Sequence, residues 1–408
     1  MKNSQSENRK VSDSMGELEV PQQALYGAQT QRAINNFPVS GRKMPLEFIN
    51  ALILIKKVAA KTNAELGCID ASIADAIVEA CYSILNNPNI EQSFPVDVFQ
   101  TGSGTSSNMN ANEVIATLAS KSSNIVINPN DHVNFGQSSN DVVPTAIHVS
   151  AAISLKESLI PSIEHLISTI DEKASTLTQA TKTGRTHLMD AMPVTLEQTI
   201  KTWGQQVQFA LSQIKSVQKN IQALALGGTA VGTGINTHSD FAVLAVRELN
   251  RISNIEFTNP ESFFPLMSSQ DIAVSLSGAL KTMAVSLMKL SNDLRWMNSG
   301  PLAGLGEITL EALQPGSSIM PGKVNPVIPE STAMVCAEVI GNDTTITVAG
   351  QSGNFELNVM LPIIAEKLVC SLKILSTSSR LLADKAIKTF KVNSQNLEGP
   401  LDRNPILV

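Results

Sequence analysis

Apolar residues recur at steps of three and four between residues 270 and 299. The positions that keep this spacing are Leu276, Leu280, Met283, Leu287, Leu290 and Leu294. Such spacing places side chains on one face of a helix, and Gly300-Pro301 ends the pattern. The helix would be about 45 Å long at roughly 1.5 Å per residue. Its opposite face is also rich in Ala, Val and Met, so we expect it to be buried nearly all round.

Four further segments predict long helices, each bounded by polar residues, glycine or proline: residues 139–178, 195–224, 329–350 and 355–388. Pro161 should kink or divide the first of them, because proline lacks the N–H that an interior helix position needs. Helices of this length seldom bury their apolar surface within one chain, so we expect an oligomer. The pattern predicts a mainly α protein built on a long-helix bundle.

The order of these segments predicts three parts. A mixed N-terminal domain covers residues 1–134, and the bundle covers residues 135–390. Residues 391–408 form a short polar stretch that ends on the apolar trio Ile406-Leu407-Val408. No internal repeat or low-complexity linker separates these parts.

Composition limits the compartment and the partners. The chain has 408 residues, 43% of them hydrophobic, and a net charge of −6 with both signs interspersed, which does not indicate a nucleic-acid partner. The four cysteines lack a CxxC pair, which is typical of a reducing compartment and offers no zinc or iron–sulfur ligand set. The sequence lacks both a run of about 18 apolar residues and an apolar stretch near its start. We expect a cytoplasmic protein with no cofactor, no metal and no membrane partner.

Four segments combine glycine with Ser, Thr and Asn side chains. They are residues 101–108 (TGSGTSSN), 137–141 (QSSND), 184–188 (GRTHL) and 316–326 (GSSIMPGKVNP). Glycines let backbone N–H groups approach an anion, and the small polar side chains supply neutral donors, so such segments could hold a carboxylate. The first three are also typical of ordinary helix caps. The fourth carries Lys323 between turn formers and is too specific for an ordinary loop.

This fourth segment resembles the signature of the fumarase/aspartase superfamily. Gly322 before the lysine is similar to the class II fumarases, whereas aspartate ammonia-lyases typically have alanine there. The resemblance covers nearly the whole chain, with further matches at residues 13–17 (DSMGE), 25–32 (LYGAQTQR), 227–234 (GGTAVGTG) and 352–358 (SGNFELN). It implies the family's long-helix fold, a homotetramer, and active sites that are each shared between three chains.

The resemblance also implies the residues of the active site. Ser317 would remove the C3 proton of malate as an alkoxide, and His187, paired with Glu330, would handle protons at the leaving hydroxyl through a water. Lys323 and Asn325 would hold a carboxylate and stabilise the doubly charged aci-carboxylate. The other substrate contacts would be Ser103, Gly104, Thr105, Ser138, Ser139, Asn140, Thr186, Ser318 and Val324. Developing charge needs preorganised donors and a cation, and a poor leaving group needs an acid poised near neutral pH.

The implied activity is that of a fumarate hydratase, the reversible anti-elimination of water from (S)-malate to give fumarate. Two alternatives stay open. An aspartate ammonia-lyase would abstract the same proton and release ammonia, but Gly322 and the fumarase-like segment around His148 disfavour it. A catalytically silent relative is disfavoured by the complete set of catalytic candidates, and the chain's length keeps it open.

The sequence departs from the family pattern at two places. The family's second, non-catalytic anion site usually has an arginine followed by His-Pro-Asn-Asp, but residues 125–131 here are IVINPND. Asn128, Asn130 and Asp131 are therefore weak candidates for that site. Family members also continue into a small C-terminal helical domain, so we interpret residues 391–408 as the remnant of a truncated one.

The remaining conspicuous residues are expected to be structural: His132, His148, His165, His238, Trp203 and Trp296. Residues 227–234 are rich in glycine but follow a helical stretch and lack the GxGxxG order, so they do not indicate a dinucleotide site.

Overall fold

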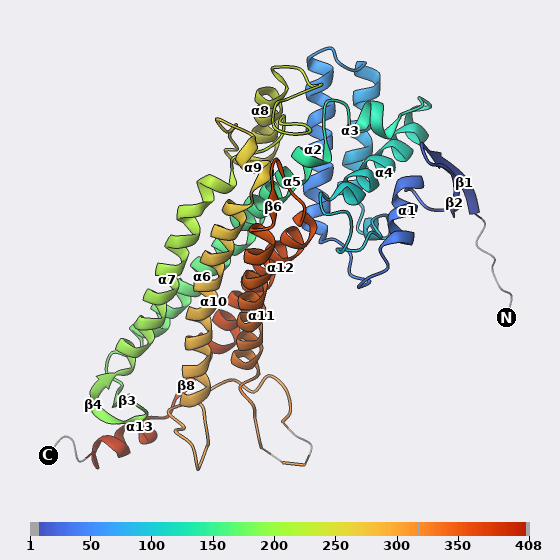
Figure 1. Cartoon of the computed structure of the whole chain (residues 1–408). Coiled ribbons are helices and arrows are strands. Elements are labelled where there is room, and N and C mark those ends of the chain that lie inside the picture. Colours follow the sequence, from blue (N-terminus) through green and yellow to red (C-terminus); the bar gives the residue numbers. More distant parts are fainter. Residues whose placement is uncertain (1–7, 317–318, 321, 405–408) are drawn as a thin grey trace, which may run out of the picture. The chain divides into compact units, whose positions relative to one another are not determined.

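The computed structural model describes residues 8–316, 319–320 and 322–404. Within them the chain divides into two compact units (Figure 1). The first unit contains the residues up to Ser154, together with Gln218–Ser275 and Thr344–Cys370. The second contains Leu155–Val217, Leu276–Asp343 and the residues from Ser371 onward. Both units consist mainly of helices, which confirms the mainly α fold.

The first unit is a cluster of helices with two small hairpins. Its elements are β1 (Asn8–Asp13), β2 (Gly16–Pro21), α1 (Ala28–Asn36), α2 (Leu46–Glu65), α3 (Ala71–Leu85), a 3₁₀ turn (Ile90–Ser93), α4 (Thr105–Ser123), a π-helical turn (Pro129–Val133), α5 (Ser139–Ser154), α8 (Phe241–Ser253), α9 (Phe264–Ser268), β6 (Gly353–Asn354) and β7 (Leu357–Asn358). Helix α2 packs against α3, α5 and α8, and β1 and β2 lie beside α1 (Figure 1). Phe48, Leu52 and Ile55 of α2 are fully buried at helical spacing, so α2 is the centre of this core.

The second unit contains the long helices. Its elements are a π-helical turn (Leu155–Leu159), α6 (Ile160–Ser175), β3 (Thr181–Thr186), β4 (Met189–Thr195), α7 (Leu196–Ile221), α10 (Asp271–Met297), β5 (Ile308–Thr309), α11 (Val327–Gly350), α12 (Leu361–Leu382), a second π-helical turn (Ala383–Ile387), β8 (Lys391–Val392) and α13 (Ser394–Leu401). Helices α7, α10, α11 and α12 also contribute residues to the first unit. Hydrogen bonds tie neighbouring helices, such as the one from Trp203 Nε1 on α7 to Asp293 Oδ2 on α10 at 2.8 Å.

The leucine face of α10 is buried as predicted, with all six positions fully enclosed. The expected burial on every side is wrong for the chain by itself. Lys281 and Lys289 are half exposed, and Val285 between them is 55% exposed, so the described residues leave this stripe of α10 open. By length and composition alone, helix α10 could also cross a membrane. The buried core helices of other proteins meet the same two criteria.

Two predicted helices differ in detail from the observed ones. A π-helical turn separates α5 from α6, and Pro161, which lacks a backbone N–H, is the second residue of α6 directly after that turn. Residues 355–360 are not helical, and α12 begins only at Leu361. Asn358 prevents the earlier start, because its Nδ2 donates to the Ala349 carbonyl at 2.9 Å and its Oδ1 accepts from Met360 N at 2.8 Å.

The predicted division into three parts, with boundaries at residues 134 and 390, differs from this division into two units and stays a prediction. The trio Ile406-Leu407-Val408 lies outside the described residues.

Candidate active site

The loop before α4 brings backbone N–H groups and hydroxyls to the start of a helix. Gly104 takes the left-handed conformation, with φ of +75°, and directly precedes α4. At Gly102 a Cβ atom would lie 1.8 Å from the Val359 carbonyl oxygen, so only glycine permits this approach. Gln100 Oε1 accepts from both the backbone N–H and the hydroxyl of Ser107 at 2.9 Å. The loop is therefore held by its own side chains and by backbone contact.

The loop before α5 is held by a buried carboxylate. Asp141 is fully buried and accepts backbone N–H groups from Ser138 at 2.9 Å, Gly227 at 2.9 Å and Thr229 at 3.0 Å. Burial raises the pKa of Asp141, while these three donors oppose that rise. Asn140 Nδ2 donates to the Ala230 carbonyl at 2.8 Å. The 227–234 glycine segment thus anchors this loop.

The two loops meet. Asn108 Nδ2 of α4 donates to Ser139 Oγ at 3.0 Å, and Gly104 lies against Val143 of α5 so closely that a Cβ would approach its side chain to 2.8 Å. The structure therefore brings together Ser103, Gly104, Thr105, Ser138, Ser139 and Asn140, and we call this set the cradle. Two helix N-termini favour an anion here. The oxygens of Ser138 and Ser139 already accept hydrogen bonds, so their hydrogens remain to donate.

In the second unit, His187 lies at the tip of the β3–β4 hairpin. The two-residue turn consists of His187 and Leu188, with φ of +55° and +60°. Turns of this kind favour Asn and Gly, so two bulky residues here store backbone strain, as is common at functional sites. The base of the hairpin is fixed by Glu307, which is 2% exposed and accepts from Arg185 Nη1 at 2.6 Å and pairs with Lys182 Nζ at 3.1 Å.

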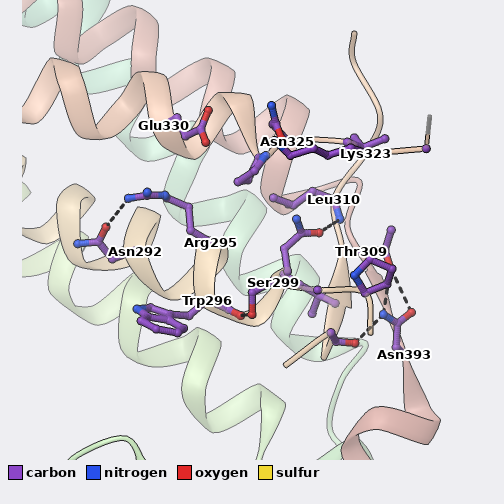
Figure 2. A pocket seen from close by; sticks show the side chains of 18 residues that line it. Asn292, Arg295, Trp296, Ser299, Thr309, Leu310, Lys323, Asn325, Glu330 and Asn393 are labelled. Carbon is purple, nitrogen blue, oxygen red and sulfur yellow. Dashed lines mark hydrogen bonds between the residues drawn. The ribbon is translucent and has the colours of Figure 1, made fainter. Parts of the chain in front are cut away.

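A pocket of about 830 Å³ lies at the end of α10 in the second unit (Figure 2). Its walls come from the last turns of α10, residues 299–310, residues 322–326, the start of α11 and Asn393. It contains four of the predicted site residues, namely Lys323, Val324, Asn325 and Glu330. Neutral amides hold the walls, since Asn298 Oδ1 accepts from Leu310 N at 2.8 Å and Asn393 Nδ2 donates to the Gly306 carbonyl at 2.7 Å.

Gly316 and Lys323 lie close together. A Cβ at Gly316 would lie 1.4 Å from the Lys323 carbonyl oxygen, so the two strands of the loop touch there. Gly322 has φ of +78°, a conformation that alanine adopts only with strain. Glycine at 322 therefore has a physical role in the loop's shape. Ser317 and Ser318 lie outside the described residues.

Known proteins resemble this chain over most of its length. The model of a lyase family matches residues 16–341. A class II fumarate hydratase of Pseudomonas aeruginosa is 62% identical over 396 residues, covering 97% of this chain and 86% of that protein. This chain belongs to the class II fumarate hydratase family.

Two further members support the assignment. A class II fumarate hydratase of Xylella fastidiosa is 56% identical, covering 97% of this chain and 84% of that protein. The crystal structure of recombinant class II fumarase from Schistosoma mansoni matches with a TM-score of 0.96 and 39% identity, covering 98% of this chain and 88% of that one.

For other described residues that the fumarase resemblance singled out, the structure shows a position but not the expected contact. Thr186 ends β3 beside His187, but within the described ranges no hydrogen bond or ion pair joins His187 to Glu330, and their pairing stays a prediction. Among the residues that the structure places, no group of three or more His, Cys, Asp or Glu side chains could hold a metal ion.

At the family's second anion site, the side chain of Asn128 turns inward on its own backbone. Its Oδ1 accepts from Asn130 N at 2.8 Å and from Asp131 N at 3.0 Å. These two N–H groups are therefore already satisfied at the start of a π-helical turn.

The sequence reasoning missed buried charged residues that support the candidate site, among them Glu307 and Lys56. Glu307 fixes the His187 hairpin, and Lys56 lies beneath the cradle with 0% exposure. Arg185, within the GRTHL segment, and the nearby Lys182 are the basic residues that could have indicated an acidic partner. Lys56 gave no signal, because its helix reads as an ordinary amphipathic one.

Proposed function

We propose that this fumarase-family chain catalyses the reversible anti-elimination of water from (S)-malate to give fumarate. The observation that carries the proposal is the cradle, where two helix N-termini and neutral hydroxyl and amide donors converge. One carboxylate of a small dicarboxylate fits such donors. The identity to named fumarate hydratases supports the same reaction.

Side chains of the second unit would carry the chemistry. Lys323 and Asn325 hold the carboxylate next to the reacting carbon and stabilise the doubly charged aci-carboxylate as it forms. Ser317 takes the C3 proton as an alkoxide, while Ser318 and Val324 contact the substrate. His187, with Glu330, moves the proton at the hydroxyl through a water, together with Thr186.

We further propose a homotetramer in which three chains contribute to each site. Exposed apolar side chains on the long helices support it, since Val285 of α10 is 55% exposed and Met334 of α11 is 69% exposed. We place the enzyme in the cytoplasm, acting without metal, nucleic acid or membrane. For Asn128, Asn130 and Asp131 we propose capping of the π-helical turn in place of anion binding.

The test is fumarate formation, followed by ultraviolet absorbance, with purified protein and no added metal. The protein is offered (S)-malate and then L-aspartate, each with and without a chelator. Fumarate from malate alone, unaffected by chelator, is expected. Fumarate from aspartate alone would instead identify an ammonia-lyase, and no product from either would indicate a catalytically silent relative.

A further inference from the structure

A lysine is buried at the centre of the first unit without an assigned task. Lys56 of α2 has 0% exposure, whereas lysines are almost never fully buried unless they are paired. Its Nζ donates to Asn134 Oδ1 at 2.8 Å and to Gln137 Oε1 at 2.9 Å. Burial lowers the pKa of Lys56 to about 7. Burying an ammonium group costs free energy of folding, so we expect the contacts of Lys56 to contribute to a function.

Both partners of Lys56 lead directly to the cradle. Gln137 immediately precedes Ser138, and its Nε2 also donates to the Val133 and Phe135 carbonyls. The side chain of Gln137 therefore fixes the backbone from which Ser138 and Ser139 project.

The second partner reaches the cradle through α4. Asn134 Oδ1 also accepts from Asn108 Nδ2 at 3.3 Å and from Asn112 Nδ2 at 3.2 Å. The same Asn108 amide group donates to Ser139 Oγ at 3.0 Å. One continuous network thus runs from Lys56 through Asn134 and Asn108 to a cradle hydroxyl.

The charge of Lys56 has a counterpart at the other end of the same loop. The charge of the Asp141 carboxylate opposes the lowering of the Lys56 pKa by burial, and the charge of Lys56 opposes the raising of the Asp141 pKa by burial. The loop between Gln137 and Asp141 is therefore clamped at both ends by buried groups of opposite sign, and the residues between the clamps are Ser138, Ser139 and Asn140.

We propose that Lys56 is a positioning residue for substrate binding, which holds the 137–141 loop from beneath so that the hydroxyls of Ser138 and Ser139 face the substrate carboxylate. The inference rests on the proposed function. Replacing Lys56 by an apolar residue removes the donor to Gln137 Oε1 and leaves Asn134 Oδ1 with only the longer hydrogen bonds from Asn108 and Asn112. The loop then shifts to satisfy these two oxygens, and the cradle loses its geometry.

The expected kinetic result is a change in KM and little change in kcat. The cradle holds the carboxylate that does not carry the developing charge, so it binds substrate and transition state about equally. Lys56→Met should raise KM by roughly 10-fold or more and change kcat by less than about 3-fold. A merely structural loss would reduce the amount of active enzyme and leave KM unchanged.

Lys61→Met is the matched control. Lys61 lies on the same helix of the same unit and donates to Glu248 at 3.2 Å, away from the loop. Gln137→Met removes the loop partner of Lys56 from the same hydrogen-bond network. It provides a second variant should Lys56→Met fail to fold. The double variant should raise KM no further than the single ones, because both changes break the same contact.

Hydrogen exchange of the backbone amides at residues 138–141, in the full-length protein without substrate, separates this inference from the proposed function. Faster exchange in Lys56→Met or Gln137→Met, but not in Lys61→Met, supports it even if malate is not turned over. Unchanged exchange in both network variants overturns it, as does wild-type KM, or a rise in KM equal to that of Lys61→Met.

Discussion

The cradle of the first unit and the catalytic candidates of the second unit differ in chemistry and in how they are held. Cradle side chains are neutral, and the buried Asp141 fixes the backbone that carries Ser138 through hydrogen bonds from three backbone N–H groups. The candidates His187 and Lys323 lie exposed on a hairpin tip and a loop. The proposed function thus places recognition on helix starts, and proton and charge chemistry on an exposed hairpin tip and an exposed loop.

This division follows from what each group must do. Neutral donors discriminate only by geometry, so they need a rigid support. Groups that exchange protons or meet a developing charge must reach the substrate and admit or exclude water, which loops do well. If this is correct, equivalent changes should cost stability in the first unit and activity in the second.

The largest expected effect is the loss of charge at Lys323. Lys323→Met should lower kcat/KM by about 10²–10³-fold, because the aci-carboxylate loses its cation. Stability should hardly change, since Lys323 is exposed. Fumarate formation from malate and denaturant unfolding measure the two quantities. Lys385→Met, at another exposed lysine of the second unit, is the control; an equal loss there would remove Lys323 from the mechanism.

The next prediction applies one substitution to both units. Gly102→Ala in the first unit should lower the free energy of unfolding by about 3 kcal/mol, because a Cβ would lie 1.8 Å from the Val359 carbonyl oxygen. Gly316→Ala in the second faces a closer obstacle, the Lys323 carbonyl oxygen at 1.4 Å. It should nevertheless cost less than about 1 kcal/mol of stability and about 10²-fold in kcat, because an exposed loop can open.

Gly399→Ala is the control for this pair, because its new Cβ would meet only Arg403 Nη2 at 3.9 Å. Unfolding should be compared at matched protein concentration, since association shifts apparent stability. The comparison between the units fails if Gly316→Ala unfolds the protein as readily as Gly102→Ala does.

The sequence predicted the helices well because their apolar spacing is long and regular, as the leucine face of α10 shows. It predicted the cradle residues through a family resemblance, and the structure brings Ser103–Thr105 and Ser138–Asn140 together. It could not predict Lys56 or Glu307, because the burial of a charge depends on which distant segments cover it. The error at residues 355–360 has a similar cause, since Asn358 bonds to carbonyls at the end of α11.

An intermediate effect is expected when acid lowers the free energy of unfolding through a histidine of α5, the helix that supports the cradle. His148 is buried, its Nδ1 lies 2.7 Å from the Ala223 carbonyl oxygen, and burial lowers its pKa from 6.5 to about 4. Between these values the unfolded state binds more protons, so stability falls as the pH falls from 6.5 to about 4. The loss should reach about 3 kcal/mol at 1.36 kcal/mol per unit.

His148→Asn keeps a donor for the Ala223 carbonyl and removes the titrating ring. Its unfolding free energy should therefore depend less on pH in this range than that of the wild type. His238→Asn, at an exposed histidine of the same unit, should retain the wild-type acid dependence. If His148→Asn also retains it, another buried group destabilises the first unit in acid.

The smallest expected effect concerns the strained turn that carries His187. Leu188 is 69% exposed and has φ of +60°, so Leu188→Gly removes strain without removing core. We expect the free energy of unfolding to rise by about 0.5 kcal/mol. This is the difference between about 1 kcal/mol of relieved strain and the opposing entropic cost of glycine. Leu188→Ala keeps a Cβ in the same conformation and should gain almost nothing, and equal gains would show that strain is not the cause. If Leu188→Gly also lowers kcat, the strain holds His187 in place, and the second unit, like the first, orders its reactive group at a cost in stability.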